Sequence, residues 1–275
     1  MSDPILIVAA LNGTRTREEC PKVPLTAADL AAEARRAVDA GAGLLHIHAR
    51  TPDGAPAFDF VIDEIVAAVR GAVDAPIAIS TQRAPQTSLG TVTALFRVLS
   101  DLPDAGAVHV RPPEPDLPAH REEARQILEA LEEADVRPVP VAGSLDALGD
   151  LQALYADALL GRAPFALLQL GGPMSESSDV AAGTPQNALR LIDAARESLA
   201  GLPVVASGRD EASPVVQAVA AAAGAHIRAG LEDATTLPDG APASSSAQLV
   251  EHAVRLAAAL GRAPLGPDEA RRLLR

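Results

Sequence analysis

Gly41-Ala-Gly-Leu-Leu-His-Ile-His-Ala-Arg50 is the stretch that decides the fold, because it predicts an apolar strand that carries two histidines and ends before a turn. Successive side chains of a strand point to opposite faces, so Leu44, His46 and His48 share one face. A rise of about 3.3 Å per residue separates the two histidines by about 6–7 Å along the backbone. Neutral imidazole is a common ligand of zinc and similar cations, so the pair is a candidate metal site. A structural role is the alternative, but two buried imidazoles without partners would cost several kcal/mol.

The same arrangement, a short apolar run followed by an alanine-rich helical segment, recurs along the whole chain. The predicted strands cover residues 5–10, 44–48, 77–80, 107–110, 136–141, 165–170, 204–206 and 225–229. The predicted helices cover residues 27–40, 58–70, 87–99, 117–134, 145–160, 184–199, 212–223 and 245–260, with Thr26 as the N-cap of the first helix and Gly41 as its stop. Strict alternation implies a parallel sheet with helices outside it. Eight units favour an α/β fold of the (β/α)8 TIM barrel type, as a single domain over residues 1–275, over an open doubly wound sheet.

Composition excludes several classes of protein. Hydrophobic residues make up 48% of the 275 residues and aromatic residues only 2%, so the core must consist of Ala, Val, Leu and Ile. The formal net charge of −13 disfavours binding to nucleic acid or to an anionic membrane surface. The single cysteine, Cys20, excludes an internal disulfide and fits a reducing compartment. No signal peptide and no apolar run of about 20 residues is recognisable, so we expect a soluble cytoplasmic protein.

A second informative stretch is His226-Ile-Arg-Ala-Gly-Leu-Glu-Asp233, at the end of the eighth predicted strand. In a closed barrel only the first strand separates the eighth strand from the second, which brings Glu232 within reach of His46 and His48. Two histidines and a carboxylate form a known catalytic zinc set that leaves room for water or substrate. The alternative is that Glu232 and Asp233 belong to an acidic turn that leads into a helix.

The loops that follow the sixth and seventh predicted strands also carry candidate residues. Ser207, Gly208 and Arg209 follow the seventh strand, where barrels often bind phosphate through a small residue, a glycine and a cation. Residues 171–183 are rich in Gly and Ser and are predicted to form a mobile loop over this end of the barrel.

Hydroxyl and cationic residues end three other strands. Ser80 and Thr81 end the third strand and are candidates for holding a substrate carboxylate, although hydroxyls at strand ends are usually turn formers. Arg50 directly follows the histidine pair and is a further candidate for substrate binding. His109 and Arg111 end the fourth strand on one face, where they would add to a cationic mouth. The alternative for Arg111 is an ion pair with an acidic residue of the following loop.

The order and spacing of these motifs resemble the β-keto acid cleavage enzyme family. The histidine pair combined with Arg-x-Gly-Leu-Glu-Asp is the specific part of the resemblance. The matching pieces span nearly the whole chain: Asn12-Gly13, Pro24-Leu-Thr26, Ala40-Gly-Ala42, His46-Ile-His-Ala-Arg50, Asp53-Gly54, Arg228-Ala-Gly-Leu-Glu-Asp233, Pro238-Asp-Gly240, Gly261-Arg262 and Glu269-Ala-Arg271.

The resemblance implies a zinc-dependent barrel that condenses a β-keto acid with acetyl-CoA and releases acetoacetate and a new acyl-CoA. By motif, His46, His48 and Glu232 would bind zinc or another divalent metal. Asp233 would be the general base, Arg228 would orient the reacting groups, and Ser80 or Thr81 would hold the substrate carboxylate. The family also suggests a homo-oligomer, with a tetramer as one possibility.

Two departures from the family pattern limit this expectation. Gln82-Arg83 stands where the family usually has a glycine pair. Pro138 is followed by Val139-Pro-Val141, where the family carries glutamates, one of which is expected to support the base. Two alternatives therefore stay open: a metal-dependent aldolase or hydrolase that does not use coenzyme A, and a metal-binding barrel without catalysis.

Overall fold

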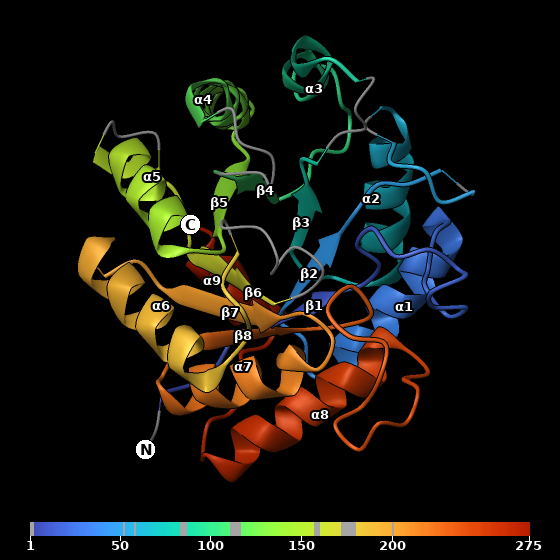
Figure 1. The fold of residues 1–275 in the computed structure, drawn as a ribbon. Helices are drawn as coiled ribbons and strands as arrows, with labels where there is room; N and C mark the ends of the chain where they lie inside the picture. The colour runs from blue at the N-terminus through green and yellow to red at the C-terminus, as the bar shows by residue number, and fades with distance from the viewer. Residues whose placement is uncertain are drawn as a thin grey trace.

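Eight parallel strands close into a barrel in the order β1 to β8 in the computed structural model (Figure 1). The structure describes residues 3–51, 53–57, 59–82, 87–110, 117–156, 160–171, 180–199 and 201–275. The strands are β1 (Ile7–Ala10), β2 (Leu44–Ile47), β3 (Ile77–Ser80), β4 (Ala105–His109), β5 (Arg137–Ala142), β6 (Ala166–Leu170), β7 (Val204–Gly208) and β8 (His226–Ala229). The predicted (β/α)8 TIM barrel of the α/β class is confirmed.

Helices surround the barrel, and those after the first seven strands follow the predicted order. They are α1 (Ala27–Asp39), α2 (Val61–Ala72), α3 (Leu89–Leu95), α4 (Leu117–Glu133), α5 (Leu145–Ala156), α6 (Pro185–Ser198), α7 (Ala212–Ala222), α8 (Ser246–Ala259) and α9 (Pro267–Leu273). The predicted start of α1 is confirmed, because the Thr26 side chain accepts from the N–H of Asp29 in a capping box. Gly41 has φ +112, a backbone conformation that ends the helix.

The core has an outer layer between strands and helices and a smaller layer inside the barrel. The inner layer is built from small and branched residues, among them Leu6, Val8, Leu44, Ala78, Ala105, Ala107, Val139, Val141, Phe165, Leu167 and Val205. Helix α9, which the sequence patterns did not predict, closes the amino-terminal end of the barrel, where Ala270 and Leu274 join this inner layer. A Cβ on Gly43, just before β2, would lie 2.6 Å from the carbonyl oxygen of Leu265. The barrel interior is therefore filled at its base.

Buried polar groups hold the chain termini to the base of the barrel. The guanidinium of Arg262 donates to the carbonyls of Asp3, Ala221 and Ala225 at 2.6–2.9 Å. Nδ1 of His226 accepts from the N–H of Leu6 at 3.0 Å. Burial, reinforced by the charges of two nearby arginines, lowers the pKa of His226 to about 4. The fold therefore requires a neutral imidazole here.

Strand β5 is unusual because it carries Pro138 and Pro140, which have no N–H to donate to a neighbouring strand. The N–H of Arg137 donates to the carbonyl of Asp104, just before β4, and successive N–H groups of a strand point to opposite neighbours. The two missing donors therefore lie on the side of β6. The ladder has five register pairs between β4 and β5 but two between β5 and β6.

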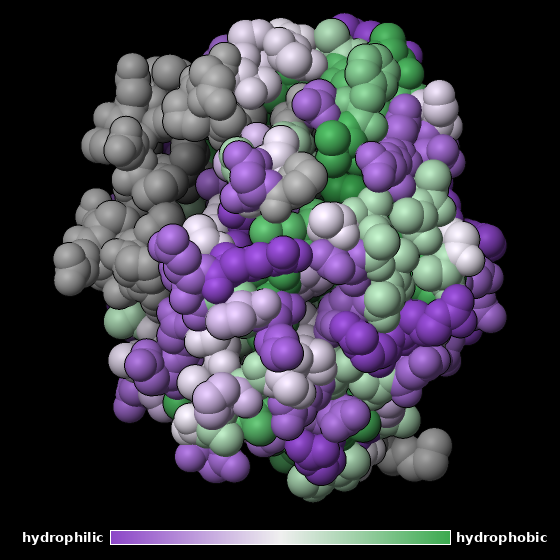
Figure 2. Space-filling view, turned by 90° about the vertical axis from the view of Figure 1, so that its right-hand side faces the viewer, coloured by the Kyte–Doolittle hydropathy of each residue, from purple (hydrophilic) through white to green (hydrophobic). Residues whose placement is uncertain are grey.

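The outer face over α1 and α2 mixes hydrophilic and hydrophobic residues (Figure 2). Large exposed hydrophobic side chains are scattered over several elements: Phe60, Val98, Leu145, Leu189 and Leu260. Single exposed hydrophobic residues of this kind are normal on a protein surface. Within the described ranges, no helix combines the length and the apolar character that a membrane span needs.

Candidate metal centre and active site

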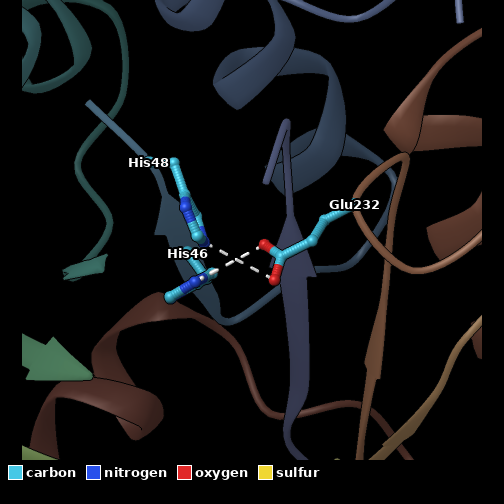
Figure 3. A group of neighbouring side chains, drawn as sticks. All are labelled: His46, His48 and Glu232. Carbon is cyan, nitrogen blue, oxygen red and sulfur yellow. Dashed lines mark ion pairs between the residues drawn. The ribbon is translucent and has the colours of Figure 1, made fainter. Parts of the chain in front are cut away.

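His46, His48 and Glu232 meet at the carboxyl end of the barrel, and Figure 3 shows the three side chains pointing toward one another. His46 lies on β2 and His48 follows this strand directly, and their rings pack edge to face with centroids 5.2 Å apart. Strand β1 pairs with both β2 and β8, so the loop after β8 reaches across one strand, as expected from the sequence. Nε2 of His46 lies 3.4 Å from Oε2 of Glu232, and Nε2 of His48 lies 3.6 Å from Oε1.

Two glycines let Glu232 reach the histidines. Gly230 has φ +155, and a Cβ there would lie 2.0 Å from the carbonyl oxygen of Ala10, so only glycine lets the loop after β8 pack on β1. Gly13 has φ +57, and a Cβ there would lie 2.3 Å from Cγ of Glu232. The backbone of the β1 loop therefore leaves the space that the glutamate side chain fills.

Asn12 joins the end of β1 to the histidine strand. Its Oδ1 accepts from the N–H groups of Gly13 and His48, and its Nδ2 donates to the carbonyl of His48, all at 2.9 Å. The carboxamide thus continues the strand ladder beyond Ala10 and fixes the backbone of a metal-ligand candidate. The sequence pattern predicts Asn12 only as part of a turn. Its position directly after a buried strand is nevertheless a signal that its side chain could bind the backbone of a neighbouring strand.

Arg228 and Asp233 form a buried ion pair beside the histidines. The Nε of Arg228 donates to Oδ2 of Asp233 at 3.0 Å, and its Nη2 donates to Oδ1 at 2.6 Å. The same Nη2 lies 3.0 Å from Oε1 of Glu232. The side chains of Arg228 and Asp233 are 2% and 0% exposed, which is compatible with ionised groups only because each is paired.

The charges around the site set the protonation of its members. Burial raises the pKa of Glu232, but the positive charge of Arg228 and contacts with the two imidazoles outweigh burial and hold it well below its ordinary value. Burial lowers the pKa of His46 to about 3, with Glu232 opposing and Arg228 contributing. Burial also raises the pKa of Asp233, although Arg228 opposes the shift. An ionised Glu232 beside a neutral His46 is the state in which both residues coordinate a metal.

The three side chains fit a divalent cation. Oε2 of Glu232 is buried and has no hydrogen-bond partner, as expected of an oxygen that a cation would satisfy. Zinc ligands at about 2.1 Å in tetrahedral geometry lie about 3.4 Å apart, which matches the observed nitrogen–oxygen separations. Arg228 balances only one of the two buried carboxylates, so a cation would also offset the remaining negative charge.

Ser80 and Thr81 differ in their orientation. Ser80 and His48 line the same pocket, together with Thr14 and Gln82, and the Ser80 Oγ accepts from the N–H of Gln82 at 3.2 Å. Thr81 instead donates its hydroxyl to the carbonyl of Ala107 at 2.7 Å. Ser80 is therefore the hydroxyl of this pair that faces the pocket beside the histidines.

Arg50, a candidate for substrate binding, contacts the protein's own backbone. Its guanidinium donates to the carbonyls of Gly13, Arg15 and Gly54, and it is 5% exposed although it lines the pocket beside His48. Arg15, which sequence reasoning missed, donates to the carbonyl of Leu231 at 3.2 Å and pairs with Asp210. These two arginines fix the loops after β1, β2 and β8 around Glu232 and Asp233.

The residues after β7 lie on the same end of the barrel. Ser207 is fully buried and its Oγ has no hydrogen-bond partner, and Nε of Arg209 is also buried without one. A Cβ on Gly208 would lie 2.5 Å from the carbonyl oxygen of Ala212, so this glycine allows the start of α7 to pack against β7.

Other predicted features of the mouth lie partly outside the described residues. His109 ends β4 with an exposed side chain, whereas Arg111 is outside the part of the chain that the structure describes, as is Arg83. The predicted mobile loop over 171–183 falls largely on residues 172–179, which also lie outside it. On β5, Val139 and Val141 belong to the inner layer, so apolar side chains occupy this part of the barrel interior.

The fold and site together define a (β/α)8 barrel with a buried His-His-Glu set, suited to a divalent metal, at the carboxyl ends of its strands. Its sequence matches the model of the beta-keto acid cleavage enzyme family over residues 4–275. The chain belongs to this family, and the resemblance expected from its motifs is confirmed.

Two curated relatives share the name 3-keto-5-aminohexanoate cleavage enzyme. The one from Acetoanaerobium sticklandii is 28% identical over 287 residues, which cover 98% of this chain and 97% of the relative. The one from Fusobacterium nucleatum is 29% identical over 301 residues, which cover 100% of this chain and 98% of the relative.

Solved structures share the barrel at lower identity. The binary complex of ObcA with oxaloacetate has a TM-score of 0.74 at 18% identity, with 92% of this chain and 67% of that chain covered. A type I 3-dehydroquinate dehydratase from Clostridium difficile has a TM-score of 0.56 at 13% identity, with 93% and 92% covered. These similarities concern the fold.

Proposed function

We propose that the protein transfers the acyl part of a β-keto acid to coenzyme A, with acetyl-CoA as cosubstrate and acetoacetate as the second product. The observation that carries the proposal is the buried His46, His48 and Glu232 set with Asp233 directly beside it, in a chain of the beta-keto acid cleavage enzyme family. The overall change forms a bond between C2 of the keto acid and the acetyl carbonyl carbon. It breaks the bond between C2 and C3, and the released acyl group passes to the sulfur of coenzyme A.

His46, His48 and Glu232 would hold the metal, with zinc as the proposed ion. When bound, a divalent ion with an open position supplies Lewis acidity to the keto oxygen and makes the protons on C2 more acidic. The neutral His46 and the ionised Glu232 are in the protonation states that such ligands need.

Asp233 is proposed to take the proton from C2 and to return it to acetoacetate at the end of the reaction. Arg228, through its two hydrogen bonds to Asp233, fixes the carboxylate and offsets its charge at a buried position. Ser80, at the pocket beside His48, is proposed to donate to the carboxylate of the substrate.

Isotope transfer tests the reaction directly. Acetyl-CoA labelled with ¹³C at the carbonyl is incubated with a panel of β-keto acids, and the label is expected in the keto carbon of acetoacetate. Turnover that persists without any thioester would instead support a metal-dependent aldolase or hydrolase. A protein that retains its metal and turns over no member of the panel would be a binding protein, a result that the missing β5 glutamate makes worth testing.

Metal analysis tests the site separately. Purified protein is expected to contain one divalent ion per chain, and His46→Ala should remove most of it. His252→Ala is the matched control, because His252 lies on α8 away from the site, and it should keep the wild-type metal content. The proposal also includes a homo-oligomer, which sedimentation velocity measures.

A further inference from the structure

Three buried side-chain atoms in the described part of the chain have no hydrogen-bond partner: Glu232 Oε2, Ser207 Oγ and Arg209 Nε. The first belongs to the metal site. The other two lie two residues apart at the end of β7, where the mechanism above gives them no role. Buried polar atoms without partners are rare in proteins, and a ligand is one explanation for them.

Ser207 lies on the inner face of the barrel. Val205, two residues earlier on the same strand, belongs to the inner layer, so Ser207 points the same way. Gln169 is its register partner on β6, follows the inner residue Leu167 by two positions, and forms no hydrogen bond with the described residues. A hydroxyl and a carboxamide, neither with a hydrogen-bond partner among the described residues, therefore stand on neighbouring strands above the apolar filling of the barrel.

Arg209 adds a cation to these two groups. Its guanidinium forms no ion pair or hydrogen bond with the described residues, although its charge acts on the carboxyl of Asp233. Two acidic groups near it are engaged elsewhere, since Asp210 pairs with Arg15 and Asp233 with Arg228. The charge of Arg209 also lowers the pKa of Glu19, which accepts a hydrogen bond from the N–H of Thr16. A partly buried arginine that forms no ion pair with the described residues is suited to bind an anion.

On the half of the mouth away from the metal, the inner residues at the described strand ends include no acidic side chain. The inner residues at the ends of β4, β5, β6 and β7 are His109, Val141, Gln169 and Ser207. An ammonium group on the substrate would find no carboxylate among them. A carboxylate would find donors at β6 and β7.

We propose that Ser207 and Arg209, with Gln169 beside them, form a subsite for a second carboxylate at the far end of the substrate. This inference rests on the proposed function and narrows its substrate to a β-keto dicarboxylate. A phosphate of coenzyme A offers similar oxygen chemistry. The carboxylate is favoured because Ser207 is fully buried inside the barrel, and a single carboxylate is much smaller than a diphosphate.

Binding without turnover tests the subsite. Isothermal calorimetry on the zinc-supplemented protein, without acetyl-CoA, compares three six-carbon ligands: 3-oxohexanedioate, 3-oxohexanoate and 3-keto-5-aminohexanoate. The wild type is expected to bind the diacid about 10- to 100-fold more tightly than the monoacid, as for charge-assisted hydrogen bonds, and the amino acid most weakly. Arg209→Gln and Ser207→Ala should remove most of that preference and leave monoacid binding unchanged. Arg35→Gln, which removes an exposed cation of α1, is the matched control and should keep the preference for the diacid.

The outcomes separate this inference from the proposed function. The subsite is overturned if the wild type binds the diacid and the monoacid with equal affinity, or if both variants still prefer the diacid. It is also overturned if the protein binds none of the keto acids. If Arg209→Gln binds coenzyme A more weakly but binds pantetheine and the diacid as tightly as the wild type, Arg209 binds a phosphate of coenzyme A. That result would overturn the proposed carboxylate subsite. A diacid preference that depends on Arg209, in a protein that never transfers label from acetyl-CoA, keeps the subsite and refutes the proposed function.

Discussion

Substitution of Gly13 by alanine tests whether the β1 loop positions Glu232, the proposed metal ligand. The new Cβ would lie 2.3 Å from Cγ of Glu232, whereas carbon atoms in contact prefer about 3.5–4.0 Å. The glutamate must therefore move by more than about 1 Å, whereas metal–ligand distances in a proper site lie within about 0.2 Å of their usual values. We expect Gly13→Ala to weaken zinc binding by about 10- to 100-fold, as seen when groups that orient metal ligands are removed.

The backbone contributes a separate effect that a control variant isolates. Alanine at the φ of +57 observed for Gly13 costs about 1–2 kcal/mol of stability whatever the surrounding space. Gly240 has φ +85 and nothing within 4 Å of a Cβ, so Gly240→Ala carries the same kind of backbone strain without any contact to the site.

Competition with a chromophoric chelator measures zinc affinity, and thermal unfolding of the metal-free proteins measures stability. Both variants should lose similar stability, and only Gly13→Ala should lose zinc affinity. Wild-type affinity in Gly13→Ala, or an equal loss in Gly240→Ala, would refute the idea that the loop backbone positions Glu232.

Three further variants or conditions test the framework of the site. Because the pKa of His226 is lowered to about 4 in the fold and is about 6.5 when unfolded, stability should be fully present above pH 6.5 and fall by about 3 kcal/mol as the pH drops to 4. Denaturant titrations of wild type and His226→Gln across this range should show a shallower fall in the variant, and parallel curves would contradict the assignment. Arg228→Met leaves Asp233 buried without its partner, so chemical denaturation should report a loss of about 3–5 kcal/mol, and an unchanged midpoint would count against the ion pair. Asn12→Ala removes three hydrogen bonds and should lower the unfolding free energy by about 2–4 kcal/mol and also weaken zinc binding, whereas a pure stability loss would limit Asn12 to the fold.

Periodicity predicted most of the barrel because each of its units is a local pattern. Apolar runs such as 77–80 are bounded by turns, and the capping residue Thr26 and the stop at Gly41 are visible in sequence. Helix α9 was missed because it has only seven residues, and its burial depends on packing against the distant base of the barrel. Its signals were Pro267 at the first turn and Glu269 two residues later.

The candidate metal ligands could be predicted because closure of the barrel fixes which strand ends are neighbours. His46 and Glu232 are far apart in sequence, but the order of strands alone brings them together. Side-chain hydrogen bonds to backbone leave no comparable pattern. Arg50, which looked like a substrate group, donates to loop carbonyls, and Arg15 gave no signal because its partners come from loops after β7 and β8.

The prolines of β5 have a consequence for the chain before its barrel is complete. A ring of strands has no edge, but a partly formed ring that ends at β5 exposes one, and exposed edges recruit strands from other chains. Pro138 and Pro140 remove two donors from that edge, so it is a poor template for such intermolecular pairing. The same two prolines that reduce the hydrogen bonding between β5 and β6 thus make the unfinished barrel less prone to aggregation.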